Sequence, residues 1–218
     1  MKLLELKSVF KKYGDQHVLN GISISFENGK IYLIKGRSGC GKSTLLNICS
    51  LLENPDRGEV FYKGTETKKL SEIERKAILR GHIGYIFQDY NLFEELSVYQ
   101  NLQIYLLSIT RKSIAEMDKM IKEQLEALHL THKTKDKAKF LSGGERQRLT
   151  LARTLLLPRD LIFADEPSAN IDEKNTCIMK EIFLRLKMAG TTIIIVTHDR
   201  VFDEIADVIF ELDEGILK

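Results

Sequence analysis

The chain has 218 residues, of which 43% are apolar and 29% charged, and its formal net charge is +2. These values are ordinary for one globular domain, alone or with a smaller lobe, and they give no electrostatic reason to expect nucleic acid as a partner. The apolar runs are too short to span a bilayer. The three cysteines form no C-x-x-C pair and do not lie beside clustered histidines, so they suggest neither a metal site nor a disulfide framework, and a reducing cytosol fits best.

Two kinds of strand are predicted in chain order. Short β-like stretches predict a small antiparallel β layer at 3–10, 22–26 and 58–62. Continuous apolar runs predict strands buried on both faces, as in a parallel sheet covered by helices, at 31–34, 83–87, 161–164 and 192–196. Each run is followed by a loop with distinctive polar residues. We therefore expect an α/β fold with a mostly parallel sheet.

The middle of the chain has a helical pattern. Apolar residues between 97 and 141 are spaced to share one helix face: Met117, Met120, Ile121, Leu125 and Leu128. A packed interior explains this face better than a ligand groove does. We expect one domain over 1–218, with a core at about 1–89 and 158–218 and an α-helical lobe at about 90–157.

A phosphate-binding motif lies after the first buried strand. Residues 36–43, Gly-Arg-Ser-Gly-Cys-Gly-Lys-Ser, fit G-x-x-x-x-G-K-[ST] and precede a predicted helix at 44–52. Backbone N–H groups of the glycines and the helix start attract phosphate oxygens. Lys42 would supply a full charge to the β- and γ-phosphates, and Ser43 would offer its hydroxyl to Mg²⁺. This motif predicts a P-loop nucleoside triphosphatase core.

Polar residues at the ends of the other buried strands complete a predicted catalytic edge. Asp165 and Glu166 follow the run at 161–164, where Asp165 suits the metal and Glu166 could act as general base toward water. Because Pro167 follows, the two acids could alternatively have a purely structural role, in which they end a strand and open a turn. His198 and Gln88 follow two further strands, so we expect His198 at the γ-phosphate and Gln88 near metal or water.

A second phosphate-binding surface is predicted at Leu141-Ser-Gly-Gly-Glu145. Ser142 and Glu145 have the spacing of a capping box. Capping alone does not explain Gly143 and Gly144, since glycine weakens a helix by roughly 1 kcal/mol relative to alanine. Bare N–H groups at a helix start can approach an anion closely. Because the chain already has one phosphate cradle, this surface is expected to serve a nucleotide held by a second copy.

With these motifs in this order, the chain resembles the nucleotide-binding subunit of ATP-binding-cassette (ABC) transporters over essentially its whole length. The resemblance implies that Tyr13 stacks on adenine and that 168–172 is the D-loop. It implies catalytic roles for Glu166, His198, Lys42 and Gln88, and metal contacts from Ser43, Gln88 and Asp165. It implies that ATP is bound by Tyr13, Gly36, Arg37, Ser38, Gly39, Cys40, Gly41, Lys42, Ser43, Thr44, Ser142, Gly143 and Gly144.

The segment Glu-Pro-Ser-Ala-Asn-Ile-Asp at 166–172 is similar to stand-alone ATPases of the lipoprotein-releasing, macrolide-exporting and antimicrobial-peptide-resistance type. This implies an ATPase, with ATP and Mg²⁺ as cofactors, on the cytoplasmic face of the cell membrane. Two copies would sandwich two nucleotides head to tail, and a separate exporter permease would dock near Gln88 and 89–93. Packing within the lobe explains Tyr90, Leu92 and Phe93 equally well.

Three alternatives stay open at this point. A cassette ATPase could act on nucleic acid or ribosomes, although such proteins usually carry tandem cassettes or inserted modules. It could also relay a signal through a membrane protein without transport. An ordinary P-loop kinase or GTPase is disfavoured by the segment at 141–145 and by the absence of an N-K-x-D motif.

Overall fold

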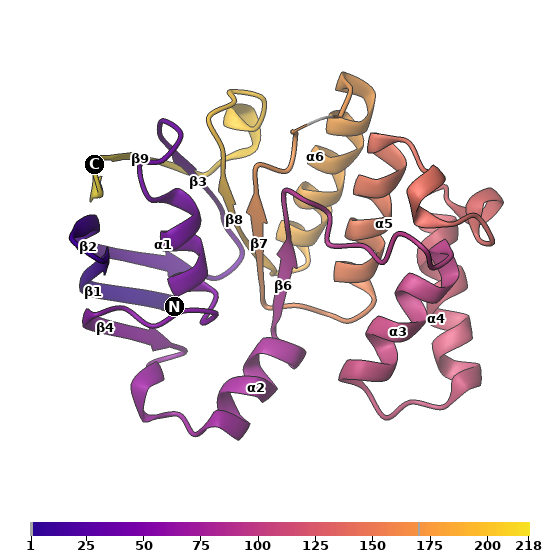
Figure 1. Ribbon diagram of the computed structural model, residues 1–218, viewed down its shortest axis with the longest axis horizontal. Helices are drawn as coiled ribbons and strands as arrows, with labels where there is room; N and C mark the ends of the chain where they lie inside the picture. Colours follow the sequence, from indigo (N-terminus) through magenta and orange to yellow (C-terminus); the bar gives the residue numbers. More distant parts are fainter. Residues whose placement is uncertain (1, 170) are drawn as a thin grey trace.

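The computed structural model describes residues 2–169 and 171–218. Its central sheet has the strand order β10-β9-β3-β8-β7-β6 (Figure 1). The pairings in this sheet are parallel except for β10 (Ile216–Leu217), which is antiparallel to β9. The parallel strands are β3 (Ile31–Lys35), β6 (Ile83–Ile86), β7 (Leu161–Asp165), β8 (Thr192–Val196) and β9 (Val208–Asp213). The predicted mostly parallel sheet is confirmed, and its strands end at one common edge.

A second, antiparallel sheet has the order β2-β1-β4-β5, which confirms the predicted small layer. Its strands are β1 (Lys2–Tyr13), β2 (Gln16–Glu27), β4 (Arg57–Tyr62) and β5 (Thr65–Glu66). The first two are longer than the sequence predicts, because a tight hairpin pairs Tyr13 directly with Gln16. The end of β1 therefore carries Tyr13.

Helices flank the central sheet (Figure 1). They are α1 (Lys42–Cys49), α2 (Glu72–Gly81), α3 (Val98–Ile109), α4 (Ile114–Ala127), α5 (Gly143–Leu155) and α6 (Glu173–Met188), with short 3-10 turns at Thr67–Lys69, Thr131–Lys133, Ala138–Phe140 and Asp203–Ile205. Helix α1 starts and ends earlier than the predicted 44–52. Within the described ranges, no helix has both the length and the apolarity needed to cross a bilayer.

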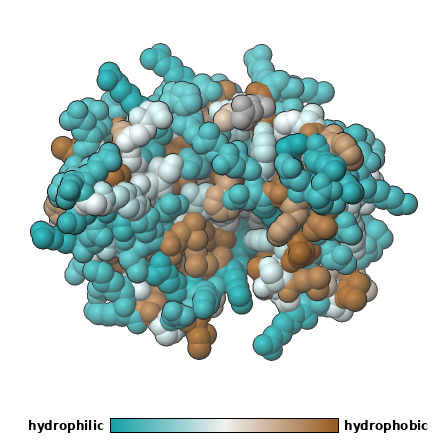
Figure 2. Space-filling view, in the orientation of Figure 1, coloured by the Kyte–Doolittle hydropathy of each residue, from teal (hydrophilic) through white to brown (hydrophobic). Residues whose placement is uncertain are grey.

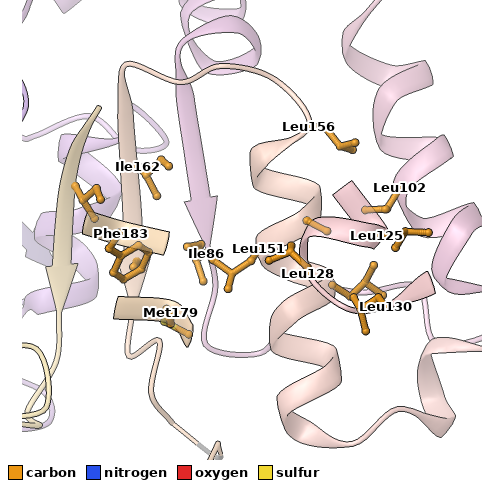
Figure 3. Close-up of a cluster of buried hydrophobic side chains, with 14 of the residues drawn as sticks. Ile86, Leu102, Leu125, Leu128, Leu130, Leu151, Leu156, Ile162, Met179 and Phe183 are labelled. Carbon is orange, nitrogen blue, oxygen red and sulfur yellow. The ribbon is translucent and has the colours of Figure 1, made fainter. Parts of the chain in front are cut away.

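The central sheet is buried on both faces. Ile31 and Leu33 pack into one apolar cluster, whereas Tyr32 and Ile34 pack into another. Figure 3 shows the first cluster, which continues from Ile162 on β7 through the helices to Leu102 on α3. One continuous core therefore joins the sheet to α3, α4 and α5. The boundaries of a separate helical lobe at 90–157 stay a prediction.

The predicted methionine-containing face lies on α4. Met117, Ile121 and Leu125 are buried against the first cluster, as are Leu128 just after the helix and, in part, Met120. The interior-packing interpretation of this face is therefore correct.

The helix starts differ in how their first N–H groups are satisfied. Helices α2, α3, α4 and α5 begin with complete capping boxes, in which a serine hydroxyl and a glutamate or glutamine three residues later satisfy the first N–H groups. Helix α1 instead follows Gly41, whose φ is 104°, and no side chain of the described residues caps it. Uncapped N–H groups at a helix start are free to bind an anion.

Candidate active site

A cavity of 670 Å³ lies at the edge where β3, β7 and β8 end. Its lining contains twelve of the residues predicted for the site: Tyr13, Arg37, Ser38, Gly39, Gly41, Lys42, Ser43, Thr44, Gln88, Asp165, Glu166 and His198. Two further residues line it: Ala169 belongs to the predicted D-loop, whereas Val18 was not predicted. Ligands in open α/β sheets bind beyond the carboxyl ends of the strands, which is where this cavity lies.

The loop between β3 and α1 forms the cradle of the cavity. Gly41 needs to be glycine, because its φ is 104° and a Cβ would lie 2.8 Å from the carbonyl oxygen of Val18. The Nζ atom of Lys42 donates hydrogen bonds to the carbonyl oxygens of Gly36 at 2.9 Å and Arg37 at 3.0 Å. The ammonium group is thereby held within the loop.

Asp165 and Ser43 form the polar pair expected at a metal. Ser43 and Asp165 both line the cavity. Burial raises the pKa of Asp165 above its ordinary value, and the negative charge of Glu166 adds to this rise. A bound cation would relieve both effects.

This donor set fits Mg²⁺. The described residues contain no group of three or more histidine, cysteine, aspartate or glutamate side chains that could hold a metal without help. Mg²⁺ usually binds through one or two protein ligands plus substrate phosphates, which is what Ser43 and Asp165 beside a phosphate loop would provide.

Glu166 is held in position from β8. Its Oε2 accepts a hydrogen bond of 2.8 Å from the Thr197 hydroxyl, and its Oε1 lies 3.0 Å from Nδ1 of His198 and 3.9 Å from Nζ of Lys42. The backbone φ of Glu166 is 44°, a left-handed conformation that costs a non-glycine residue about 1–3 kcal/mol. The carboxylate therefore points along a defined direction in the cavity.

Tyr13 lies at the mouth of the cavity. Its hydroxyl donates to both carboxylate oxygens of Glu53 at 2.8 Å, and Nζ of Lys11 lies 5.5 Å from its ring centre. Burial and the Glu53 carboxylate raise the pKa of Tyr13. Tyr13 as a whole is 49% exposed, which leaves area for a stacked base.

Several predicted residues lie outside this cavity. Gly36 and Cys40 belong to the same loop, and Cys40 lines a neighbouring hollow of 360 Å³. Ser142, Gly143 and Gly144 begin α5 and do not line the cavity. Of the predicted D-loop, Asn170 lies outside the described residues.

Packing explains why residue 144 is a glycine, and this reason could not be predicted from the sequence. A Cβ at Gly144 would collide with the side chain of Asn175 in the first turn of α6. Ser142 and Glu145 complete the predicted capping box, with the Ser142 N–H donating to Glu145 at 2.8 Å. The glycine thus permits close contact between α5 and α6, whatever ligand its N–H binds.

Thr197 is a site residue that sequence reasoning missed. It is fully buried and holds Glu166. Its only signal in the sequence is that it directly precedes His198, and a threonine at the end of a buried strand is commonplace.

Comparisons with known proteins agree with this geometry. Residues 19–169 match the family described as ABC transporter. An uncharacterized ABC transporter ATP-binding protein of Methanocaldococcus jannaschii is 37% identical over 217 residues, covering 98% of this chain and 96% of that protein. The lipoprotein-releasing system ATP-binding protein LolD of Cytophaga hutchinsonii is 35% identical over 217 residues, covering 99% of each.

Two further comparisons concern a longer relative and solved structures. The macrolide export ATP-binding/permease protein MacB of Campylobacter jejuni is 36% identical over 213 residues, but the chain spans only 33% of its length. The dimeric structure of a bacterial ABC transporter cassette has a TM-score of 0.87 and 32% identity, covering 97% of this chain and 95% of that one. The same cassette in a post-hydrolysis state bound to ADP and Pi also has a TM-score of 0.87, with 31% identity.

Proposed function

The chain belongs to the ABC transporter family, in which it is an ATPase subunit of the LolD and MacB type, and we propose that it powers a separate membrane permease. The observation that carries this proposal is the single cavity that contains Lys42 of the phosphate loop together with Asp165, Glu166 and His198. Because its relatives are named for lipoprotein release and macrolide export, the cargo is a lipoprotein, a peptide or an antibiotic, and the direction is export.

ATP binds in the 670 Å³ cavity, with its phosphates against the loop at 36–43. Without nucleotide, the Lys42 ammonium group donates to two backbone carbonyls. Charged phosphate oxygens are stronger acceptors than carbonyls, so the ammonium group turns to the β- and γ-phosphates when ATP binds. Ser43 and Asp165 hold Mg²⁺, assisted by Gln88. Mg²⁺ held there would supply positive charge to the phosphates. The uncapped start of α1 provides further N–H donors.

Glu166 activates the attacking water as general base. Its carboxylate accepts from Thr197 and lies beside Nδ1 of His198, so both oxygens have defined surroundings. His198 is 74% exposed in its side chain and can therefore also reach the γ-phosphate of a bound nucleotide. Tyr13 contributes the adenine contact through its exposed ring.

Two copies close head to tail around two nucleotides. This proposal is supported by the position of Ser142, Gly143 and Gly144, which lie outside the cavity of their own chain, and by the dimeric state of the similar cassette. The start of α5 then binds the γ-phosphate held by the partner copy. Residues 90–157 act as the lobe that carries this surface toward the other chain.

The permease docks near the segment after Gln88, at the cytoplasmic face of the membrane. Within that segment, Leu92 packs against the core, whereas Phe93 is 56% exposed. Leu92 is therefore explained by packing within the chain, whereas the exposed Phe93 is available to contact a partner. Docking of this kind makes the chain a peripheral membrane protein.

The variant Glu166→Gln tests the proposed function. We expect its ATP turnover to fall about 100-fold or more, since a general base contributes that much, while MgATP still binds. The variant should then form dimers in MgATP, measured by gel filtration with light scattering.

The matched control is Glu123→Gln, on an exposed part of α4, which should behave like the wild type. A Glu166→Gln protein that still turns over ATP, or that remains monomeric in saturating MgATP, would contradict the assigned role.

A further inference from the structure

The hairpin turn between β9 and β10, residues 213–216, lies beside the phosphate loop; we call it the β9–β10 turn. Its central residues, Glu214 and Gly215, have φ values of 48° and 75°, which suit a two-residue hairpin turn. Figure 1 shows the C-terminal end of the chain near β2 and α1. Figure 2 shows mainly hydrophilic surface on that side of the molecule, which does not indicate a docking site for a partner. The contacts of the turn within its own chain are therefore the place to look for its role.

The β9–β10 turn is fixed to β2. A Cβ on Gly215 would collide with the carbonyl oxygen of Val18, and Gly215 is buried. The Asn20 N–H donates to the Gly215 carbonyl at 2.8 Å, and Nδ2 of Asn20 donates to the Glu214 carbonyl at 3.1 Å. Gly215 therefore has to be glycine both for its positive φ and for its close approach to Val18.

The same Val18 carbonyl supports the start of α1. A Cβ on Gly41 would lie 2.8 Å from the Val18 oxygen, so the backbone of Gly41 packs closely against it. Gly41 precedes the uncapped N–H groups of α1, which are the proposed phosphate donors. One carbonyl group therefore contacts both the β9–β10 turn and the phosphate loop.

Strand β9 also contacts the beginning of the phosphate loop. A Cβ on Gly36 would collide with the carbonyl oxygen of Leu212, which directly precedes the turn. Between these two contacts lies the hollow of 360 Å³ that Cys40 lines. Val18 lines this hollow as well as the nucleotide cavity. The end of β9 and its turn thus support the phosphate loop at both ends, directly at Gly36 and through Val18 at Gly41.

We infer that the β9–β10 turn positions the phosphate loop: Gly215 and Asn20 hold the Val18 carbonyl in place under Gly41 and thereby set the affinity for ATP. The inference rests on the proposed function, because it requires the phosphates of ATP to bind at 36–43. Neither Gly215 nor Asn20 lines the nucleotide cavity, so both act through the loop. A loop that is already held in its binding conformation loses less entropy when a ligand binds.

The expected effect concerns ATP binding more than the hydrolysis step. The proposed general base, Glu166, is held from β8 by Thr197, whereas the β9–β10 turn supports the phosphate loop. A loosened turn should therefore raise the KM for ATP and leave kcat nearly unchanged.

Binding of ATP should in return stabilise the turn, because coupling between two sites is reciprocal. The amide of Asn20 donates to the Gly215 carbonyl, and the amides of Glu211 and Lys218 donate to each other's carbonyls across the hairpin. We expect saturating MgATP to slow hydrogen exchange of these amides about twofold or more. Unchanged exchange would contradict the coupling.

The turn between β4 and β5 supplies a matched control. Its residues Lys63 and Gly64 have φ values of 48° and 80°, close to those of Glu214 and Gly215. Apart from its chain neighbours, no atom of the described residues would lie within 4 Å of a Cβ on Gly64. Gly64→Ala therefore introduces similar backbone strain without a collision, and comparison with Gly215→Ala isolates the contact with Val18.

The test measures KM for ATP, kcat and the melting temperature of the wild type and both alanine variants. Gly215→Ala should raise KM about tenfold at nearly unchanged kcat, whereas Gly64→Ala should keep the wild-type KM although its strained turn also costs stability. A wild-type KM for Gly215→Ala, or an equal rise of KM in both variants, overturns the inference.

Asn20→Ala decides the matter if Gly215→Ala does not fold. It removes the hydrogen bond from Nδ2 to the Glu214 carbonyl without adding an atom to the turn. Loss of this bond should raise KM about two- to fivefold and should weaken the effect of MgATP on hydrogen exchange of the hairpin. A wild-type KM for Asn20→Ala then overturns the inference.

Lys42→Ala distinguishes the inference from the proposed function. Equilibrium binding of MgATP, measured by calorimetry, should be lost in this variant, because the ammonium group is the proposed phosphate ligand. Wild-type binding by Lys42→Ala would contradict the proposed site itself. Loss of binding by Lys42→Ala together with a wild-type KM for Gly215→Ala would contradict only the inference.

Discussion

The Thr197 hydroxyl donates a 2.8 Å hydrogen bond to Oε2 of Glu166, although the two residues are 31 positions apart. Thr197 is fully buried, and its oxygen also accepts the N–H of Asp199 at 3.0 Å. The hydroxyl hydrogen is therefore directed at the glutamate. With the other carboxylate oxygen beside His198, this bond orients the proposed general base before nucleotide arrives.

Thr197→Val should slow ATP hydrolysis with little effect on ATP binding. The substitution keeps the shape of the side chain but removes the hydroxyl, so Glu166 loses its fixed direction while the phosphate loop stays intact. We expect kcat to fall about 10- to 100-fold at an unchanged KM. Thr197→Ser keeps the hydroxyl and should recover most of the activity. Equal kcat values for the valine variant and the wild type in steady-state assays would show that the hydrogen bond has no catalytic role.

Gly144→Ala should destabilise the fold through its contact with Asn175. The added Cβ overpacks the junction of α5 and α6, which typically costs about 1–3 kcal/mol, against a gain of up to about 1 kcal/mol for alanine in a helix. In a double-mutant cycle with Asn175→Ala, the cost of Gly144→Ala should shrink, because the colliding side chain is gone. Urea unfolding of the four proteins measures this coupling. If the effects of the two substitutions on the free energy of unfolding simply add, the proposed collision between the alanine Cβ and Asn175 is wrong.

Alkylation of Cys40 should inhibit the ATPase. Cys40 is partly exposed in the phosphate loop, so a group added to its Sγ occupies space beside the cradle. We expect N-ethylmaleimide to reduce activity at least about tenfold, with protection by ATP. Cys177 is also exposed, whereas Cys49 is buried, and burial raises the pKa of the Cys49 thiol.

Variants of the exposed cysteines separate the two thiols. Cys177→Ser should remain sensitive to the reagent and Cys40→Ala should resist it. Full activity after complete modification of Cys40 would refute the prediction.

Asp160 should make stability depend on acid pH. Its burial would raise the pKa of this carboxyl, but hydrogen bonds from Lys63 at 2.6 Å and His82 at 2.7 Å outweigh burial and lower it. A lowered folded pKa contributes stability above the unfolded value of about 3.9, and this contribution disappears as the pH falls through the folded value.

Asp160→Asn should therefore unfold at lower urea concentration than the wild type at pH 7, with a difference that narrows below about pH 4. Asp136→Asn serves as control and should show a smaller difference, because the Asp136 carboxylate pairs with Lys133, three residues away, whereas Asp160 has both Lys63 and His82. If the difference in urea stability between Asp160→Asn and the wild type stays constant from pH 7 to pH 3, ionisation of the Asp160 carboxylate is not the cause of that difference.

Residue order alone predicted most strands of the two sheets and most of the residues that line the cavity. Continuous apolar runs such as 31–34 and 192–196 predict buried strands, because a parallel strand that is covered by helices on both sides has apolar residues on both faces. The phosphate loop is recognisable because glycines, a lysine and a hydroxyl residue at this fixed spacing are suited to bind a triphosphate. Asp165, Glu166, Gln88 and His198 could be assigned to one edge because parallel strands end there, and they do line one cavity. Their chemical roles stay predictions.

Tertiary structure decided the contacts between distant segments. The bond from Thr197 to Glu166, the packing of Gly144 on Asn175 and the hold of Arg153 on Tyr90 join residues that no local pattern connects. Periodicity and spacing report which face of an element is buried, but they do not report the register in which two elements pack. That register depends on how side chains from the whole chain fill one core, so only the folded molecule shows which neighbour each site residue obtains.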